Sequence, residues 1–122
     1  MNIANQYFEG IWLDNNKKVW VIDQRLLPFE FKTIELKNLE EAVFAISDMI
    51  VRGAPLIGVT AAFGMYLAAK EKQGINEAAK QLKASRPTAI DLAKSVNRIL
   101  QKVKFEKNSS TEFILNEAKE IK

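Results

Sequence analysis

The segment from Pro55 to about Gln73 constrains the fold more than any other part of this chain of 122 residues. Its spacing predicts a helix, and its residues are apolar on almost every side until Lys70. A helix of this kind is buried on all sides, so the rest of the chain has to surround it. The apolar stretch at 54–69 falls short of the roughly 20 residues that a membrane-spanning helix needs. We therefore expect a central core helix and no membrane partner.

An arginine and a small loop, Arg52-Gly53-Ala54, come directly before this helix. Pro55 suits a first helical turn, because its missing N–H would be unpaired there in any case. The other unpaired N–H groups and the positive end of the helix dipole attract anions. Arginine is permanently charged and grips a phosphate with two parallel N–H bonds. The pattern indicates an anion site at the start of the core helix.

A second loop, Arg86-Pro87-Thr88, repeats this arrangement ahead of another predicted helix. Two such loops that converged would suit a small phosphorylated substrate. The alternative is structural: each arginine stabilises the C-terminus of the helix before it, where cations are favoured. The residues alone leave both interpretations open, and the repetition favours function.

The first 36 residues predict a small antiparallel sheet. Strands at 11–13 and 19–22 flank a turn-forming cluster and predict a β-hairpin, with Trp12 and Trp20 packed across it. A third strand is expected at 29–36, where apolar and polar residues alternate.

Helical patterns fill 37–122 around the core helix. They predict helices at about 38–51, 75–83 and 88–104, and a last one from 109 to the end of the chain. Gly74 is expected to end the core helix. The predicted side-chain caps pair Asn38 with Glu41, Thr88 with Asp91, and Ser109 with Glu112.

The last predicted helix lacks a stop signal, and its apolar face has no evident partner. We interpret this as a truncated chain, and expect the exposed face to cause self-association. The predicted fold class is α+β: a three-stranded sheet caps a bundle of about five helices. The whole of 1–122 forms one N-terminal domain of a larger protein.

Composition excludes several kinds of function. The chain has no Cys and no His, which removes thiolate metal sites, the usual zinc ligands and the commonest general base. No glycine-rich nucleotide loop follows a strand. The net charge of +3 comes from lysines interleaved with acids, as on a solvated helix surface. We expect no metal, no cofactor, no nucleic-acid partner and a cytoplasmic location.

Three further features have mainly structural interpretations. We interpret Asp23 and Arg25 as a strand-end salt bridge or turn. Asp48 lies four residues before Arg52 and is expected to pair with it on one helix face. Gly58, near the start of the core helix, packs closely or leaves room for a ligand.

Three motifs in this order resemble the S-methyl-5-thioribose-1-phosphate isomerase family, within the superfamily of the regulatory (alpha, beta, delta) subunits of translation initiation factor 2B. The resemblance covers almost the whole chain but only the N-terminal domain of that family. The motifs are Asp23-Gln24-Arg25-Leu26-Leu27-Pro28, Val51-Arg52-Gly53-Ala54-Pro55-Leu56-Ile57-Gly58 and Ser85-Arg86-Pro87-Thr88-Ala89-Ile90-Asp91-Leu92.

The resemblance implies an aldose–ketose isomerase of methionine salvage that acts on 5-methylthioribose 1-phosphate and assembles as a homodimer. It implies substrate contacts at Arg52, Gly53, Ala54 and Arg86. The family's catalytic groups belong to a Rossmann-like C-terminal domain that this chain lacks, so we assign no catalytic residue here. Asp91 stands where the family usually has Asn. The alternatives are a non-catalytic regulatory or assembly domain like those of initiation factor 2B, or a related sugar-phosphate isomerase.

Overall fold

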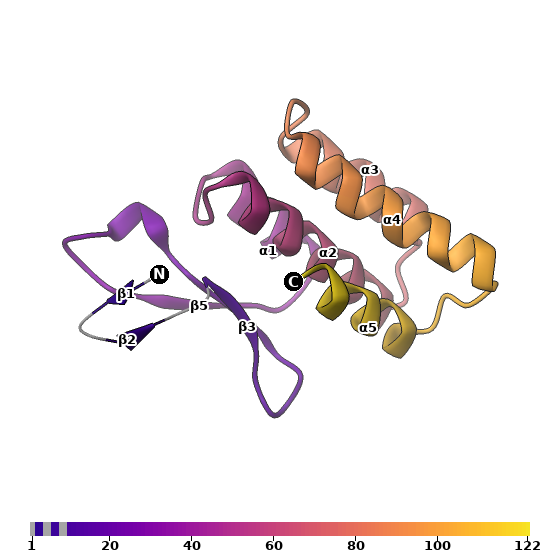
Figure 1. Ribbon diagram of the computed structural model, residues 1–122, viewed down its shortest axis with the longest axis horizontal. Coiled ribbons are helices and arrows are strands. Elements are labelled where there is room, and N and C mark those ends of the chain that lie inside the picture. Colours follow the sequence, from indigo (N-terminus) through magenta and orange to yellow (C-terminus); the bar gives the residue numbers. More distant parts are fainter. Residues whose placement is uncertain (1, 4–5, 8–9) are drawn as a thin grey trace.

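The computed structural model describes residues 2–3, 6–7 and 10–122, with side chains described from residue 10 onward. Figure 1 shows a small sheet region beside a helical bundle. The predicted α+β class is confirmed. A short hairpin of β1 (Asn2–Ile3) and β2 (Gln6–Tyr7) precedes the main sheet and was not predicted.

The main sheet is antiparallel and has the order β3-β4-β5. Its strands are β3 (Ile11–Leu13), β4 (Val19–Ile22) and β5 (Thr33–Leu36). The predicted hairpin is confirmed, and Trp12 lies opposite Trp20.

The third strand begins four residues later than predicted. β4 ends at Ile22, which pairs with Thr33, so residues 29–32 have no partner strand on β4. Phe29 in this segment is 96% exposed. The alternation of apolar and polar residues there therefore does not reflect burial.

Five helices follow, as predicted. Their bounds are α1 (Leu39–Ser47), α2 (Ala54–Lys70), α3 (Ile75–Ser85), α4 (Ile90–Glu106) and α5 (Thr111–Ile121).

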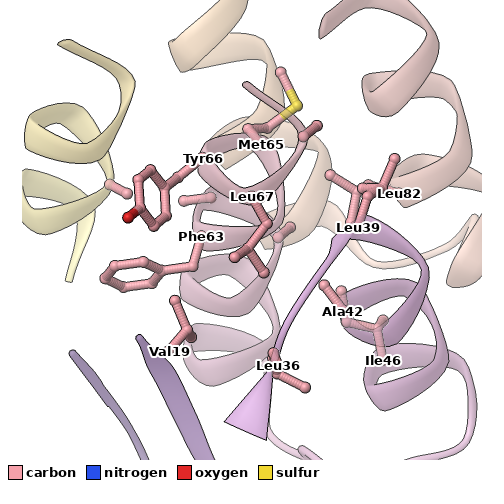
Figure 2. Packing of buried hydrophobic residues seen from close by; sticks show 14 of the residues in the cluster. Val19, Leu36, Leu39, Ala42, Ile46, Phe63, Met65, Tyr66, Leu67 and Leu82 are labelled. Carbon is pink, nitrogen blue, oxygen red and sulfur yellow. The ribbon is translucent and has the colours of Figure 1, made fainter. Parts of the chain in front are cut away.

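The helix α2 is the centre of the core, as its composition predicted. It contacts α1, α3, α4, α5 and β3. Figure 2 shows its large side chains pointing in several directions, with Phe63 towards Val19 of β4 and Leu67 towards Leu36 and Leu39. The Tyr66 hydroxyl donates to the carbonyl oxygen of Lys17 in the hairpin turn at 3.1 Å, so the sheet is also hydrogen-bonded to this helix.

The predicted helix ends are partly wrong. Asn38 caps α1 by accepting from the Glu41 N–H at 2.8 Å, as expected. Gly74 does not end α2. Instead, Lys72 takes the left-handed conformation, and Gly74 is the N-cap of α3. In α5 the cap is Ser110, one residue later than predicted.

The apolar face of α5 is not left without a partner, contrary to the sequence interpretation. Ile114, Leu115 and Ala118 are buried, and α5 packs against α2 and α4. The expected self-association therefore loses its basis, because the face that motivated it is covered within the chain.

An ion pair closes the end of β4. Asp23 follows the strand, is 97% buried at its side chain, and accepts from Arg25 Nε at 2.9 Å and Arg25 Nη2 at 2.8 Å. The Arg25 guanidinium holds the pKa of the Asp23 carboxyl below its usual value. The predicted strand-end salt bridge is confirmed.

The substitution Gly58→Val should lower the free energy of unfolding by about 1–3 kcal/mol, because overpacking a close helix contact costs this much. A Cβ at Gly58 would lie 3.1 Å from the backbone oxygen of Asp91 on α4. Urea denaturation measures the effect. Gly74→Ala is the control, since no heavy atom lies within 4 Å of its Cβ position. Equal stability of the two variants would contradict the packing interpretation.

Asp23 should make stability depend on pH in acid. Because its folded-state pKa is lowered, the ion pair stabilises the fold above the unfolded pKa of about 4 and loses this effect as pH falls through the lower folded value. In chemical denaturation at a series of pH values from neutral into acid, Asp23→Asn should flatten the fall in stability below about pH 4. The exposed Glu40→Gln is the control. Identical curves for wild type and Asp23→Asn would contradict the assignment.

Candidate anion-binding site

The loop between α1 and α2 is anchored by its apolar residues. The helix α1 ends at Ser47, and Met49 takes a left-handed φ of 62° that redirects the chain. Ile50 and Val51 are buried, and the Val51 N–H donates to the Ala45 carbonyl at 3.3 Å. The next residue, Arg52, is exposed. The core therefore fixes the loop and presents the arginine at the surface.

Gly53 gives this loop its shape. It is the N-cap residue of α2, with φ +93° and ψ 131°, a conformation that suits only glycine. No heavy atom lies within 4 Å of its Cβ position, so the space beside it is open. The first intrahelical bond of α2 joins the Ile57 N–H to the Gly53 carbonyl at 3.0 Å. The N–H groups of Ala54 and Leu56 precede that bond and form the donor end of the helix.

The electrostatics of this helix start favour an anion. The first turn of α2 contains no acidic residue, and no side chain caps it. Within residues 10–122, Arg52 forms no ion pair; its Nη2 lies 3.5 Å from the carbonyl oxygen of Gln24.

The predicted pair between Asp48 and Arg52 is wrong. Asp48 Oδ2 instead accepts from Arg25 Nη1 at 2.5 Å. The reason is the early end of α1: because Met49 leaves the helical conformation, Asp48 and Arg52 do not share a helix face.

The second loop presents Arg86 at the junction of α3 and α4. Arg86 is the C-cap residue of α3 and is half-buried, with φ −147°. Thr88 does not cap α4 as predicted. The Ala89 N–H donates to the Arg86 carbonyl at 3.0 Å, and Ala89 takes the N-cap position without a side-chain bond. Asp91 lies in the first turn of α4, where the helix dipole stabilises a negative charge.

The two helix starts lie side by side. A Cβ on Gly58 would approach Ser95 Oγ to 2.9 Å and the Asp91 backbone oxygen to 3.1 Å, so the first turns of α2 and α4 are in contact. The loops that precede them open at the same end of the bundle (Figure 1). Gly58 therefore serves close helix packing. The other interpretation, that it leaves room for a ligand, stays a prediction, because Gly58 also lines a hollow beside the two helix starts.

A hollow of about 280 Å³ adjoins these helix starts and the end of α5. Its lining is mixed in charge: Pro55, Gly58, Val59, Asp91, Lys94, Ser95, Ile121 and Lys122. Its position shows that surface space remains next to the two helix N-termini.

The 3₁₀ turn η1 (Gln24–Leu26) contacts the first arginine loop, which the sequence did not predict. The Gln24 N–H donates to the Ile50 carbonyl at 2.9 Å, and the Gln24 carbonyl faces Arg52. The motif at 23–28 was visible in the sequence, but residue spacing alone does not say which distant loop a turn touches.

A larger open hollow of about 590 Å³ lies between β5 and α1, and was also not foreseen. Trp20, Arg25, Lys32, Phe44 and Ile50 are among its lining residues.

Among the residues that the structure describes, no cluster of acidic side chains could hold a metal ion. In the same residues, no helix is long and apolar enough to cross a membrane.

Comparisons with known proteins find relatives over most of this chain. Methylthioribose-1-phosphate isomerase of Rhodospirillum centenum is 50% identical over 103 residues, which are 81% of this chain and 28% of that protein. The putative methylthioribose-1-phosphate isomerase of Methanocaldococcus jannaschii is 43% identical over 111 residues, 91% of this chain and 32% of that protein. This chain thus spans about three tenths of the length of these relatives.

Two solved structures share the fold. The 5-methylthioribose 1-phosphate isomerase of Pyrococcus horikoshii superposes with a TM-score of 0.81 at 36% identity, over 95% of this chain and 36% of that chain. The delta subunit of translation initiation factor eIF-2B from A. fulgidus gives 0.76 at 31% identity, over 94% and 36%. Residues 50–121, which hold both arginine loops, match the family described as the initiation factor 2 subunit family. With more than half of its length in that match, the chain belongs to the initiation factor 2 subunit family.

Proposed function

We propose that residues 1–122 form a single N-terminal domain that binds the substrate phosphate in an isomerase acting on 5-methylthioribose 1-phosphate. One observation carries the proposal: two arginine-bearing loops precede helices whose first turns touch, through Gly58 and Asp91. The names of the relatives at 40–50% identity supply the substrate class.

Within this proposal, the loops act by charge and position. Arg52 and Arg86 hold the phosphate oxygens through charge-assisted hydrogen bonds. Gly53 and Ala54 bring the backbone close, and the N–H groups at the start of α2 face the anion. Anchoring the phosphate orients the sugar, so that its ring can open and hydrogen can move from C2 to C1 in converting the aldose to the ketose.

The acid–base groups of that reaction are proposed to lie outside this chain, in a Rossmann-like C-terminal domain. The chain has no His and no Cys, and it spans about three tenths of its relatives. Its own contribution would be binding and electrostatic stabilisation. We further propose that the full-length protein is cytoplasmic and forms a homodimer. Analytical ultracentrifugation of that protein would test the dimer.

A second candidate is a regulatory or assembly domain. The similarity to the eIF-2B delta subunit favours it, as does Asp91, a carboxylate where the family usually has Asn. A related sugar-phosphate isomerase is a third possibility. Calorimetric titration separates the candidates: the proposal expects binding of 5-methylthioribose 1-phosphate, a regulatory domain expects none, and a related isomerase expects tighter binding of another sugar phosphate.

Loss of either arginine should weaken phosphate binding. Arg52→Gln and Arg86→Gln should each raise the dissociation constant for 5-methylthioribose 1-phosphate by about tenfold, since each removes a charged hydrogen-bond donor. Calorimetry on the full chain measures this. Lys102→Gln removes the same charge near the far end of α4 and should change affinity little. If all three variants bound alike, the binding would be a general charge effect and the assignment would fail.

Gly53→Ala tests the backbone geometry at the start of α2. Open space surrounds its Cβ position, so the cost should be backbone strain alone, about 1–3 kcal/mol. We expect lower stability in thermal denaturation and weaker sugar-phosphate binding. Gly74→Ala, at an unstrained helix start, provides the comparison. Unchanged stability and affinity for Gly53→Ala would show that the positive φ is not required.

A further inference from the structure

Arg25 holds two carboxylates at once. Its Nε and Nη2 bind the buried Asp23, while its Nη1 binds the half-exposed Asp48 at 2.5 Å. Asp23 lies at the end of the sheet, and Asp48 caps the end of α1. A single guanidinium therefore ties the sheet to the first residue of the loop that leads to Arg52.

Asp48 is the carboxylate with the shortest chain connection to Arg52. The two residues are four apart, and the loop between them turns back at Met49. Among residues 10–122, the hydrogen bond that Arg52 forms is a long one, at 3.5 Å, to the carbonyl oxygen of Gln24. Gln24 is the direct neighbour of Arg25, so both arginines lie over the same turn. If Asp48 lost its bond to Arg25, its carboxylate would therefore be near the guanidinium of Arg52, which forms no ion pair within residues 10–122.

We propose that Arg25 is a positioning residue that keeps Asp48 away from Arg52 and so leaves Arg52 available to the substrate phosphate. This inference rests on the proposed function. A carboxylate bound to Arg52 would compete with phosphate for the same N–H donors. The apparent affinity for phosphate would fall in proportion to the fraction of Arg52 that remains unpaired.

The size of the effect follows from the strength of exposed ion pairs. Such pairs shift an equilibrium by about two- to fivefold. We therefore expect Arg25→Gln to weaken binding of inorganic phosphate by about this factor, without removing it. The substitution leaves Arg52, Gly53 and the helix start in place.

A double variant separates competition from simple support of the loop. If competition is the cause, Arg25→Gln with Asp48→Asn should bind inorganic phosphate as well as the wild type, because the competing charge is gone. Asp48→Asn alone should bind like the wild type. If the double variant stayed as weak as Arg25→Gln, or if Arg25→Gln bound normally, the proposal would be overturned.

A second readout needs no ligand. In Arg25→Gln, Arg52 should take over Asp48, so the NMR signal of the Arg52 Nε–H should differ from that in Arg25→Gln with Asp48→Asn. Identical Arg52 signals in the two variants would refute the inference. Failure of the wild type to bind phosphate would instead contradict the proposed function alone. Arg25→Gln leaves the buried Asp23 without its partner and could prevent folding. In that case Arg25→Lys, alone and with Asp48→Asn, keeps a charge beside Asp23 and replaces Arg25→Gln in the same tests.

Discussion

The burial of α2 on all sides governs this structure. Because four helices and the sheet cover its length, only its ends can expose backbone groups to a ligand. Its N-terminal end emerges beside the start of α4, where Gly58 permits close contact. The core thus fixes where the two arginine loops open, and the ion pairs of Arg25 fix the approach of the first loop.

Local sequence signals predicted much of this arrangement. The uniformly apolar composition of α2 identified the core, and alternation with a turn cluster identified the hairpin that pairs Trp12 with Trp20. The Asn38 cap was predicted because its partner lies three residues away. The position of Arg52, Gly53 and Pro55 at the start of α2 was predicted as well, since an arginine, a glycine and a proline at a helix start are visible in the sequence. That an anion binds there stays a prediction.

Long-range contacts explain what was not predicted. Asp48 pairs with Arg25, 23 positions away, and not with Arg52, four positions away. The length of β5 is set by where β4 ends. The last helix looked unpartnered because spacing along the chain does not show that its apolar face packs against α2. Contact between the starts of α2 and α4 depends on helix packing, which spacing along one chain does not reveal.

Amide NMR during titration with 5-methylthioribose 1-phosphate locates the anion on the folded chain. If one phosphate binds to both helix starts, the amide signals of the non-proline residues in 53–57 and 86–91 should shift together along one binding curve, with smaller changes elsewhere. Shifts confined to one loop, or spread over the exposed lysines of α4 without saturation, would contradict a single site built from both helix starts.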